Sequence, residues 1–254
     1  MRRQSKILIQ LLTLGLLSSA ICFADVITGS FTITGTAIVG ATSITFNPDA
    51  KVATNTPSDD SNPTVGSAVT LKPLSEATTP IGETFPTLTD WLTTTSSVGN
   101  PGVGDVALDL TFLPTGINPS APIGTPPCGI SGGSVGNLCT PQIPALVSPG
   151  NPLGLSNFNL QNIAGPEFTA SFTVIGTARD LDGSADHFTG SFTATLPGTY
   201  QTVLAEIASG KTPTFTYAAQ FNFTAIPEPS YLSLLGIGGF LLVGIALYRR
   251  SQRA

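Results

Sequence analysis

The stretch from Ala170 to Gly198, "ASFTVIGTARDLDGSADHFTGSFTATLPG", decides the fold class of this chain. Apolar side chains alternate with threonine and serine on both sides of Asp182-Gly183, a dipeptide typical of tight hairpin turns. Such alternation has the period of a half-buried strand, and the turn signal lies between the two runs. The stretch therefore predicts two antiparallel strands joined as a hairpin.

The same local pattern occurs elsewhere in the chain. Gly29–Ala37 reads "GSFTITGTA" and Ala170–Ala178 reads "ASFTVIGTA", with a shorter version at Gly190–Ala194. Two explanations are open: convergent strand chemistry, with Phe facing in and Thr facing out, or an ancient duplication. The spacing between the copies is irregular, which argues against a solenoid of regular repeats.

Further segments alternate in the same way. Phe31, Ile33 and then Ile38 alternate with threonine in the opening segment, and Val106, Leu108, Leu110 and Phe112 share one face of "DVALDLTFLP". The segment "TFTYAAQFNFTA", residues 214–225, predicts a closing strand.

Two segments predict other structures. "TFPTLTDWLTTTS", which contains the only tryptophan, predicts a short helix or a turn. "TYQTVLAEIASGK" predicts a helix that Thr202 caps and Gly210 ends, with Val203, Leu204, Ile207 and Ala208 on its buried face. Together the segments predict a mainly β protein: an antiparallel β-sandwich or jelly-roll-like domain with one short helix.

The composition of residues 25–226 limits the partners of this domain. Four basic side chains stand against fourteen acidic ones in that range. Nucleic acid is excluded as a partner because phosphate binding requires clustered lysine and arginine. The length suits one domain of ordinary size or two small ones, and it is sufficient to bury a real core.

Cys128 and Cys139 are the cysteines of this region, and Cys22 lies in the N-terminal segment. In an exported protein such a pair predicts a disulfide bond. A zinc site is disfavoured, because the spacing does not fit and the chain has one histidine.

The N-terminus has the layout of a secretory signal peptide covering residues 1–24. A basic start precedes an apolar run too short to span a bilayer, and small residues follow before Asp25. Cleavage after Ala20 would also fit, because signal peptidase prefers small residues just before the cleaved bond. A lipoprotein signal would use Cys22, but Ile21 stands where a small residue is wanted.

The C-terminus, residues 227–254, has three parts. Pro227-Glu228-Pro229 precedes an uncharged apolar stretch, 231–248, that predicts a transmembrane helix, and a basic end, 249–254, follows. The basic end predicts that the last residues are cytoplasmic. A buried core helix is the alternative, but the stretch has no polar face.

This tail resembles the PEP-CTERM sorting signal of Gram-negative bacteria, on the strength of Pro227, Glu228 and Pro229, the apolar span, and Arg249-Arg250. The resemblance implies an exosortase, an inner-membrane cysteine protease or transpeptidase, as a partner. It also implies transient anchoring in the inner membrane, removal of the tail, and display at the cell surface or release. The body is loosely similar to uncharacterised exported proteins with such tails, which implies no activity.

Asp180, Asp182 and Asp186 suggest a calcium site, because calcium prefers several oxygen ligands from one loop. The loop lacks the complete EF-hand spacing, and a simple hairpin connection is the competing interpretation. Ser134 lies in a formal G-x-S-x-G match, with His187 downstream, but without the flanking strand and helix that a serine hydrolase requires.

The sequence thus favours a non-enzymatic exported protein of the cell surface or extracellular matrix, structural or adhesive in an exopolysaccharide biofilm. The alternatives are a calcium-stabilised carbohydrate-binding module and a secreted hydrolase, the latter using Ser134 and His187. No cofactor is expected apart from the calcium of the first alternative.

Overall fold

The structure is a computed structural model that describes residues 29–56, 63–95, 106–117, 128, 135–179 and 185–224. The signal segment, the connection with Asp180 and Asp182, and the tail with its apolar span lie outside the described residues. The elements are β1 Gly29–Val39, β2 Ser43–Phe46, β3 Lys51–Asn55, β4 Ala68–Leu71, β5 Leu74–Ser75, β6 Thr84–Thr95, β7 Ala107–Phe112, β8 Leu138–Cys139, the 3-10 helix η1 Pro144–Leu146, β9 Asn159–Ile163, β10 Glu167–Arg179, β11 Ala185–Pro197, α2 Tyr200–Ala208 and β12 Thr214–Thr224.

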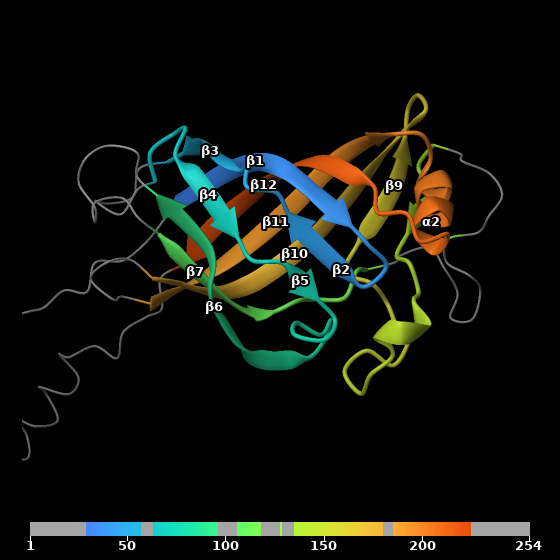
Figure 1. Ribbon diagram of the computed structural model, residues 1–254, viewed down its shortest axis with the longest axis horizontal. Coiled ribbons are helices and arrows are strands. Elements are labelled where there is room, and N and C mark those ends of the chain that lie inside the picture. Colours follow the sequence, from blue (N-terminus) through green and yellow to red (C-terminus); the bar gives the residue numbers. More distant parts are fainter. Residues whose placement is uncertain are drawn as a thin grey trace, which may run out of the picture.

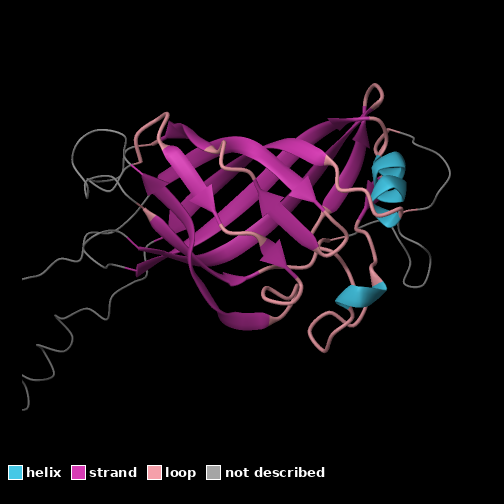
Figure 2. Ribbon diagram, in the orientation of Figure 1, coloured by secondary structure: helices cyan, strands magenta, loops and turns pink. Residues whose placement is uncertain are grey.

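The sheet closes on itself. Eight strands pair in the order β1, β3, β4, β6, β7, β10, β11 and β12, and β12 pairs with β1 again. Every one of these pairings is antiparallel, and the order in space follows the order in the chain. The result is an up-and-down barrel, which Figures 1 and 2 show from the side.

The mainly β, antiparallel prediction is confirmed, whereas the two-sheet sandwich is not the arrangement observed. Alternating strands with one buried face suit a sandwich and a barrel equally well, so the pattern alone does not separate them. Closure depends on pairings such as β7 with β10, whose strands are far apart in sequence.

The hairpin of the opening stretch is confirmed. β10 and β11 pair along their whole lengths, from Glu167 opposite Pro197 to Arg179 opposite Ala185. Residues 180–184, which join the two strands, lie outside the described residues, so the tight turn at Asp182-Gly183 stays a prediction.

Side chains fill the middle of the barrel. Phe192 lies at the centre: its ring centroid is 4.5 Å from that of Phe172, 5.4 Å from Tyr217 and 5.8 Å from Phe221. Trp91, fully buried, stacks nearly parallel to Phe188. The Phe residues of the repeated pattern, Phe31, Phe172 and Phe192, all face this interior, as predicted.

Two details of the strand predictions need correction. Ile38 lies on the outward face of β1, because the buried positions are the odd-numbered ones from Phe31 to Val39. Residues 84–95 form strand β6 and not a helix or turn, with two register shifts along its pairing with β7. These irregularities hide the two-residue period on which a strand prediction depends.

The helix prediction is confirmed in place but corrected in detail. Thr199, and not Thr202, is the N-cap residue of α2, and its side chain makes no capping hydrogen bond. Ala208 is exposed, so it does not belong to the buried face. Gly210 has a φ of 85°, the left-handed conformation expected just after a helix.

The two ends of the barrel differ. α2, β8, β9 and the small β2–β5 ribbon cover one end, where β1 finishes and β12 begins. Gly29 and Phe223 are paired, so the described chain begins and finishes at the opposite end. We call the covered end the α2 end.

Candidate functional site

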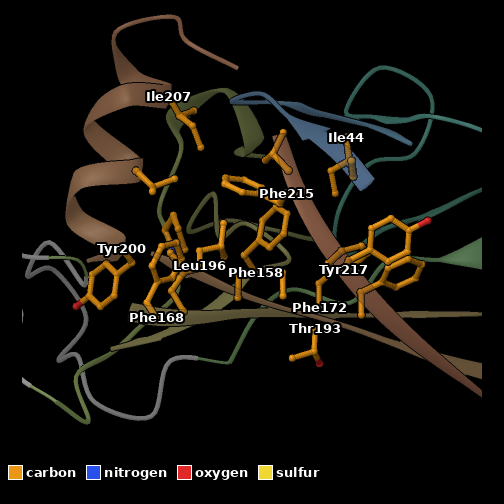
Figure 3. A pocket seen from close by; sticks show the side chains of 18 of the residues that line it. Ile44, Phe158, Phe168, Phe172, Thr193, Leu196, Tyr200, Ile207, Phe215 and Tyr217 are labelled. Carbon is orange, nitrogen blue, oxygen red and sulfur yellow. The ribbon is translucent and has the colours of Figure 1, made fainter. Parts of the chain in front are cut away.

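An apolar cavity of about 70 Å³ lies at the α2 end, between the helix and the strands β1, β10, β11 and β12. In Figure 3 the side chains of the helix lie on one side and most of those of the sheet on the other, while the labelled side chain of Thr193 points away from the rest. No lining residue is charged, and Thr193, Tyr200 and Tyr217 carry the only side-chain hydroxyls. The remaining lining residues are Ala37, Val39, Ile44, Phe46, Pro141, Phe158, Leu160, Phe168, Ala170, Phe172, Phe192, Ala194, Leu196, Val203, Leu204, Ile207 and Phe215.

A second cavity of about 70 Å³ adjoins the first. The two share the six lining residues Val39, Ile44, Pro141, Phe158, Leu204 and Ile207. The second cavity reaches the β2–β5 ribbon and the 3-10 helix, and Glu76 is its charged lining residue. We call the two together the α2-end pocket.

Helix α2 forms one wall of this pocket. Its N-terminus is fixed to β9, because the Tyr200 backbone N–H donates to Asn162 Oδ1 at 3.2 Å. Farther along, Val203, Leu204 and Ile207 turn toward the pocket but remain only half-buried. These side chains pack against the buried core and also border the cavity, so the helix covers the pocket without filling it.

Opposed alanines explain the hollow. Ala170 and Ala194 lie directly opposite each other on β10 and β11, and both line the first cavity. Two residues farther into the barrel, the opposed pair is Phe172 and Phe192, whose rings stack. The change from phenylalanine to alanine leaves space at the α2 end that the sheet itself does not fill.

Glu76 is the unusual polar group of the pocket. The residue is half-buried, and its Oε2 atom is buried without a hydrogen-bond partner. Burial raises the pKa of this carboxyl, and the negative charge of Glu83 adds to the rise, while the Ile81 backbone N–H opposes it. An acceptor in such a position favours a donor or a positive charge beside it.

The hydroxyl of Tyr217 faces the barrel interior. A Cβ atom on Gly35 would lie 2.9 Å from this oxygen, so the hydroxyl is close to β1. The hydroxyl makes no hydrogen bond, and burial raises its pKa above the ordinary value. Figure 3 shows that the hydroxyl of Tyr217 points away from the side chains of the helix.

A charged cluster lies toward the opposite end. Arg179 Nε donates to Asp109 Oδ2 at 2.7 Å, and its Nη2 donates to Asp90 Oδ1 at 2.7 Å. Burial acts to raise the pKa of Asp109, but hydrogen bonds from Arg179 and from the Asp90 backbone N–H hold it below its ordinary value. These three residues join β6, β7 and β10, so we assign them a structural role.

The structure places some of the sequence-predicted site residues. It joins Cys128 and Cys139 in a disulfide bond, with their Cα atoms 5.3 Å apart. Asp186 is buried on β11, opposite Ala178, and His187 is exposed on the same strand. In the described part of the chain, no three acidic, histidine or cysteine side chains form a group that could hold a metal ion.

Other predicted site residues lie outside the described residues: Asp180, Asp182, Ser134, Pro227, Glu228, Pro229, Arg249 and Arg250. Within the described ranges, no helix has the length and apolar character to cross a bilayer.

The α2-end pocket and Glu76 were not found by sequence reasoning. The pocket is assembled from many separate segments, and Glu76 stands alone among uncharged neighbours in the sequence. The apolar face of α2 was the one feature of the sequence that could have indicated the pocket.

No protein-family model matches this chain, and neither the curated proteins nor the solved structures provide a match.

Proposed function

We propose that this chain is an exported, non-enzymatic protein of the cell surface or extracellular matrix, with a structural or adhesive body. The observation that carries the proposal is the disulfide bond between Cys128 and Cys139. Disulfide bonds persist in oxidising compartments outside the cytoplasm and are rare within it. The bond therefore supports the destination that the signal segment indicates.

The barrel supports a structural role for the body. Its middle is filled by large aromatic side chains, and an eight-stranded barrel has an interior just wide enough for such filling. Closure also pairs both edges of each of the eight barrel strands. Because an unpaired edge can pair with another chain, this suits a domain exposed to other proteins and polymers outside the cell.

The tail supplies the route in this proposal. Pro227-Glu228-Pro229, the apolar span 231–248 and Arg249-Arg250 would be recognised by an exosortase at the inner membrane. The tail would then be removed, and the body would be displayed within the exopolysaccharide. These tail residues would be substrate residues and not catalytic ones.

Mass spectrometry of protein recovered from the cell surface and the medium tests the route. We expect the C-terminal peptide to end within or near Pro227-Glu228-Pro229. Recovery of peptides from residues 249–254 would mean that the tail is retained, and the sorting proposal would fail. Pro227→Ala combined with Glu228→Ala should block processing, whereas Gln252→Ala, in the basic end, is the matched control.

The calcium-stabilised alternative has a separate test. Titration calorimetry at millimolar calcium would detect a site formed by Asp180, Asp182 and Asp186. The buried position of Asp186 in a regular strand favours the plain hairpin interpretation, which predicts no heat of binding.

A further inference from the structure

We propose that the α2-end pocket binds a small cationic amphiphile: an unbranched alkyl chain that ends in a primary ammonium group. The chain would occupy the two adjoining cavities beneath α2, and the ammonium group would lie beside the carboxyl group of Glu76, which lines the second cavity. This binding activity is independent of how the protein is sorted.

The size of the ligand follows from the two cavities. Each has a volume of about 70 Å³, and they share six lining residues. Together they approach the roughly 150 Å³ of an apolar cavity that accepts benzene. A chain of about six carbon atoms has a comparable number of heavy atoms. The adjoining arrangement of the cavities favours an elongated chain over a single ring.

The chemistry of the walls selects an apolar chain. Alanine, valine, leucine, isoleucine and phenylalanine side chains supply most of the lining, and the first cavity has no charged residue. Water gains little in such a space, because it needs two or more polar partners. An alkyl chain entering it would remove apolar surface from water on both partners.

The chemistry of Glu76 selects the headgroup. Its buried Oε2 atom has no partner, and Glu83 contributes a second negative charge nearby. A ligand carboxylate would meet repulsion there and could not donate. An ammonium group can donate a charge-assisted hydrogen bond, which is stronger than the bond from a neutral alcohol.

Helix α2 provides access to the pocket. Its N-terminus is held to β9 through Asn162, whereas Leu204 and Ile207 cover the hollow and are half-buried. A small outward movement of the C-terminal half of the helix would admit the chain without disturbing the barrel.

Calorimetric titration of the full chain, purified without alkyl-chain detergents, tests the proposal. The probes are hexylamine, hexan-1-ol and hexanoate. We expect one molecule of hexylamine per chain, bound at least about tenfold more tightly than hexanoate, with hexanol between them. Glu76→Gln should reduce the difference between amine and carboxylate to about threefold or less, whereas Glu167→Gln, an exposed control, should preserve it.

A second pair of variants tests the pocket. Ile207→Trp should fill the space shared by both cavities and abolish binding of every probe. Ala208→Trp places the same side chain on the exposed face of the same helix and should bind as the unmodified protein does. Thermal melting of both variants verifies that each is folded.

Three results would overturn the proposal: no binding of hexylamine, equal binding of hexylamine and hexanoate by the unmodified chain, or binding that survives in the folded Ile207→Trp variant. Loss of the amine preference in Glu167→Gln as well as in Glu76→Gln would assign it to the overall acidic charge and would equally refute a specific headgroup site.

Discussion

Replacement of Phe192 by alanine tests whether the interior of the barrel is filled as the structure describes. Phe192 is 1% exposed, and its ring contacts five other aromatic rings, those of Phe46, Trp91, Phe172, Tyr217 and Phe221. Deleting a buried phenylalanine side chain costs about 3–5 kcal/mol, and the cost rises with the volume of the cavity left behind.

The upper part of that range applies to Phe192. The residue already borders the first cavity of the α2-end pocket, and closed antiparallel strands cannot easily move inward to fill a new space. We therefore expect a loss of about 4–5 kcal/mol in the free energy of unfolding, measured by urea denaturation followed by tryptophan fluorescence. Such a loss is a large part of the roughly 5–15 kcal/mol that stabilises a typical domain.

Two further variants keep this prediction testable. Phe223→Ala, at a half-buried position at the opposite end, should cost only about 1–2 kcal/mol. If Phe192→Ala does not fold, Phe192→Leu should remain folded and lose about 1–2 kcal/mol. Equal losses for Phe192→Ala and Phe223→Ala would refute the argument that Phe192 is at the centre of a filled barrel.

Three other predictions follow from the same structure. Replacing both Cys128 and Cys139 by serine should lower the free energy of unfolding by about 3 kcal/mol, as measured by urea denaturation, because the bond closes a short loop in the unfolded chain. Asp109→Asn should cost about 2 kcal/mol at pH 7, because it weakens the hydrogen bonds from Arg179. The native state holds the pKa of the Asp109 carboxyl below its value in the unfolded chain. The resulting stabilisation is fully present above the unfolded pKa and is lost as the pH falls through the folded pKa. The difference in the free energy of unfolding between Asp109→Asn and the unmodified protein should therefore shrink in acid. Gly176→Ala should prevent folding or lower the melting temperature sharply, because the added Cβ would clash with the Asp109 carbonyl oxygen on the neighbouring strand; a melting temperature unchanged within error would contradict the close approach of β7 and β10.

The strands with regular alternation could be predicted from the sequence, and the reasons are local. In β12, Tyr217, Ala219 and Phe221 face inward, and the residues between them are exposed, which gives the period of two. β6 was missed because its pairing with β7 shifts register twice and Asp90 has a φ of 48°. A local pattern fails where the backbone departs from regular geometry.

Closure of the sheet and the α2-end pocket could not be predicted, because both depend on contacts between distant segments. The seam between β7 and β10 joins Ala107 to Arg179, and nothing near either residue in the sequence specifies its partner. Glu76 has no nearby residue in the sequence that marks it as a site, since its distinction is a buried, unpaired oxygen in the folded chain.

The alternation of apolar residues with threonine or serine in β10 and β11 is nevertheless compatible with both a filled barrel and a hollow end. Where the inward positions of β10 and β11 are Phe172 and Phe192, the rings stack and the interior is closed. One inward position nearer to α2, the opposed residues are Ala170 and Ala194, and a cavity begins. An alternation of threonine with an apolar residue specifies the strand in both places, while the size of the apolar residue decides whether the space between strand and helix is filled. The position of the pocket is therefore set by a substitution of small for large side chains that leaves the strand pattern intact.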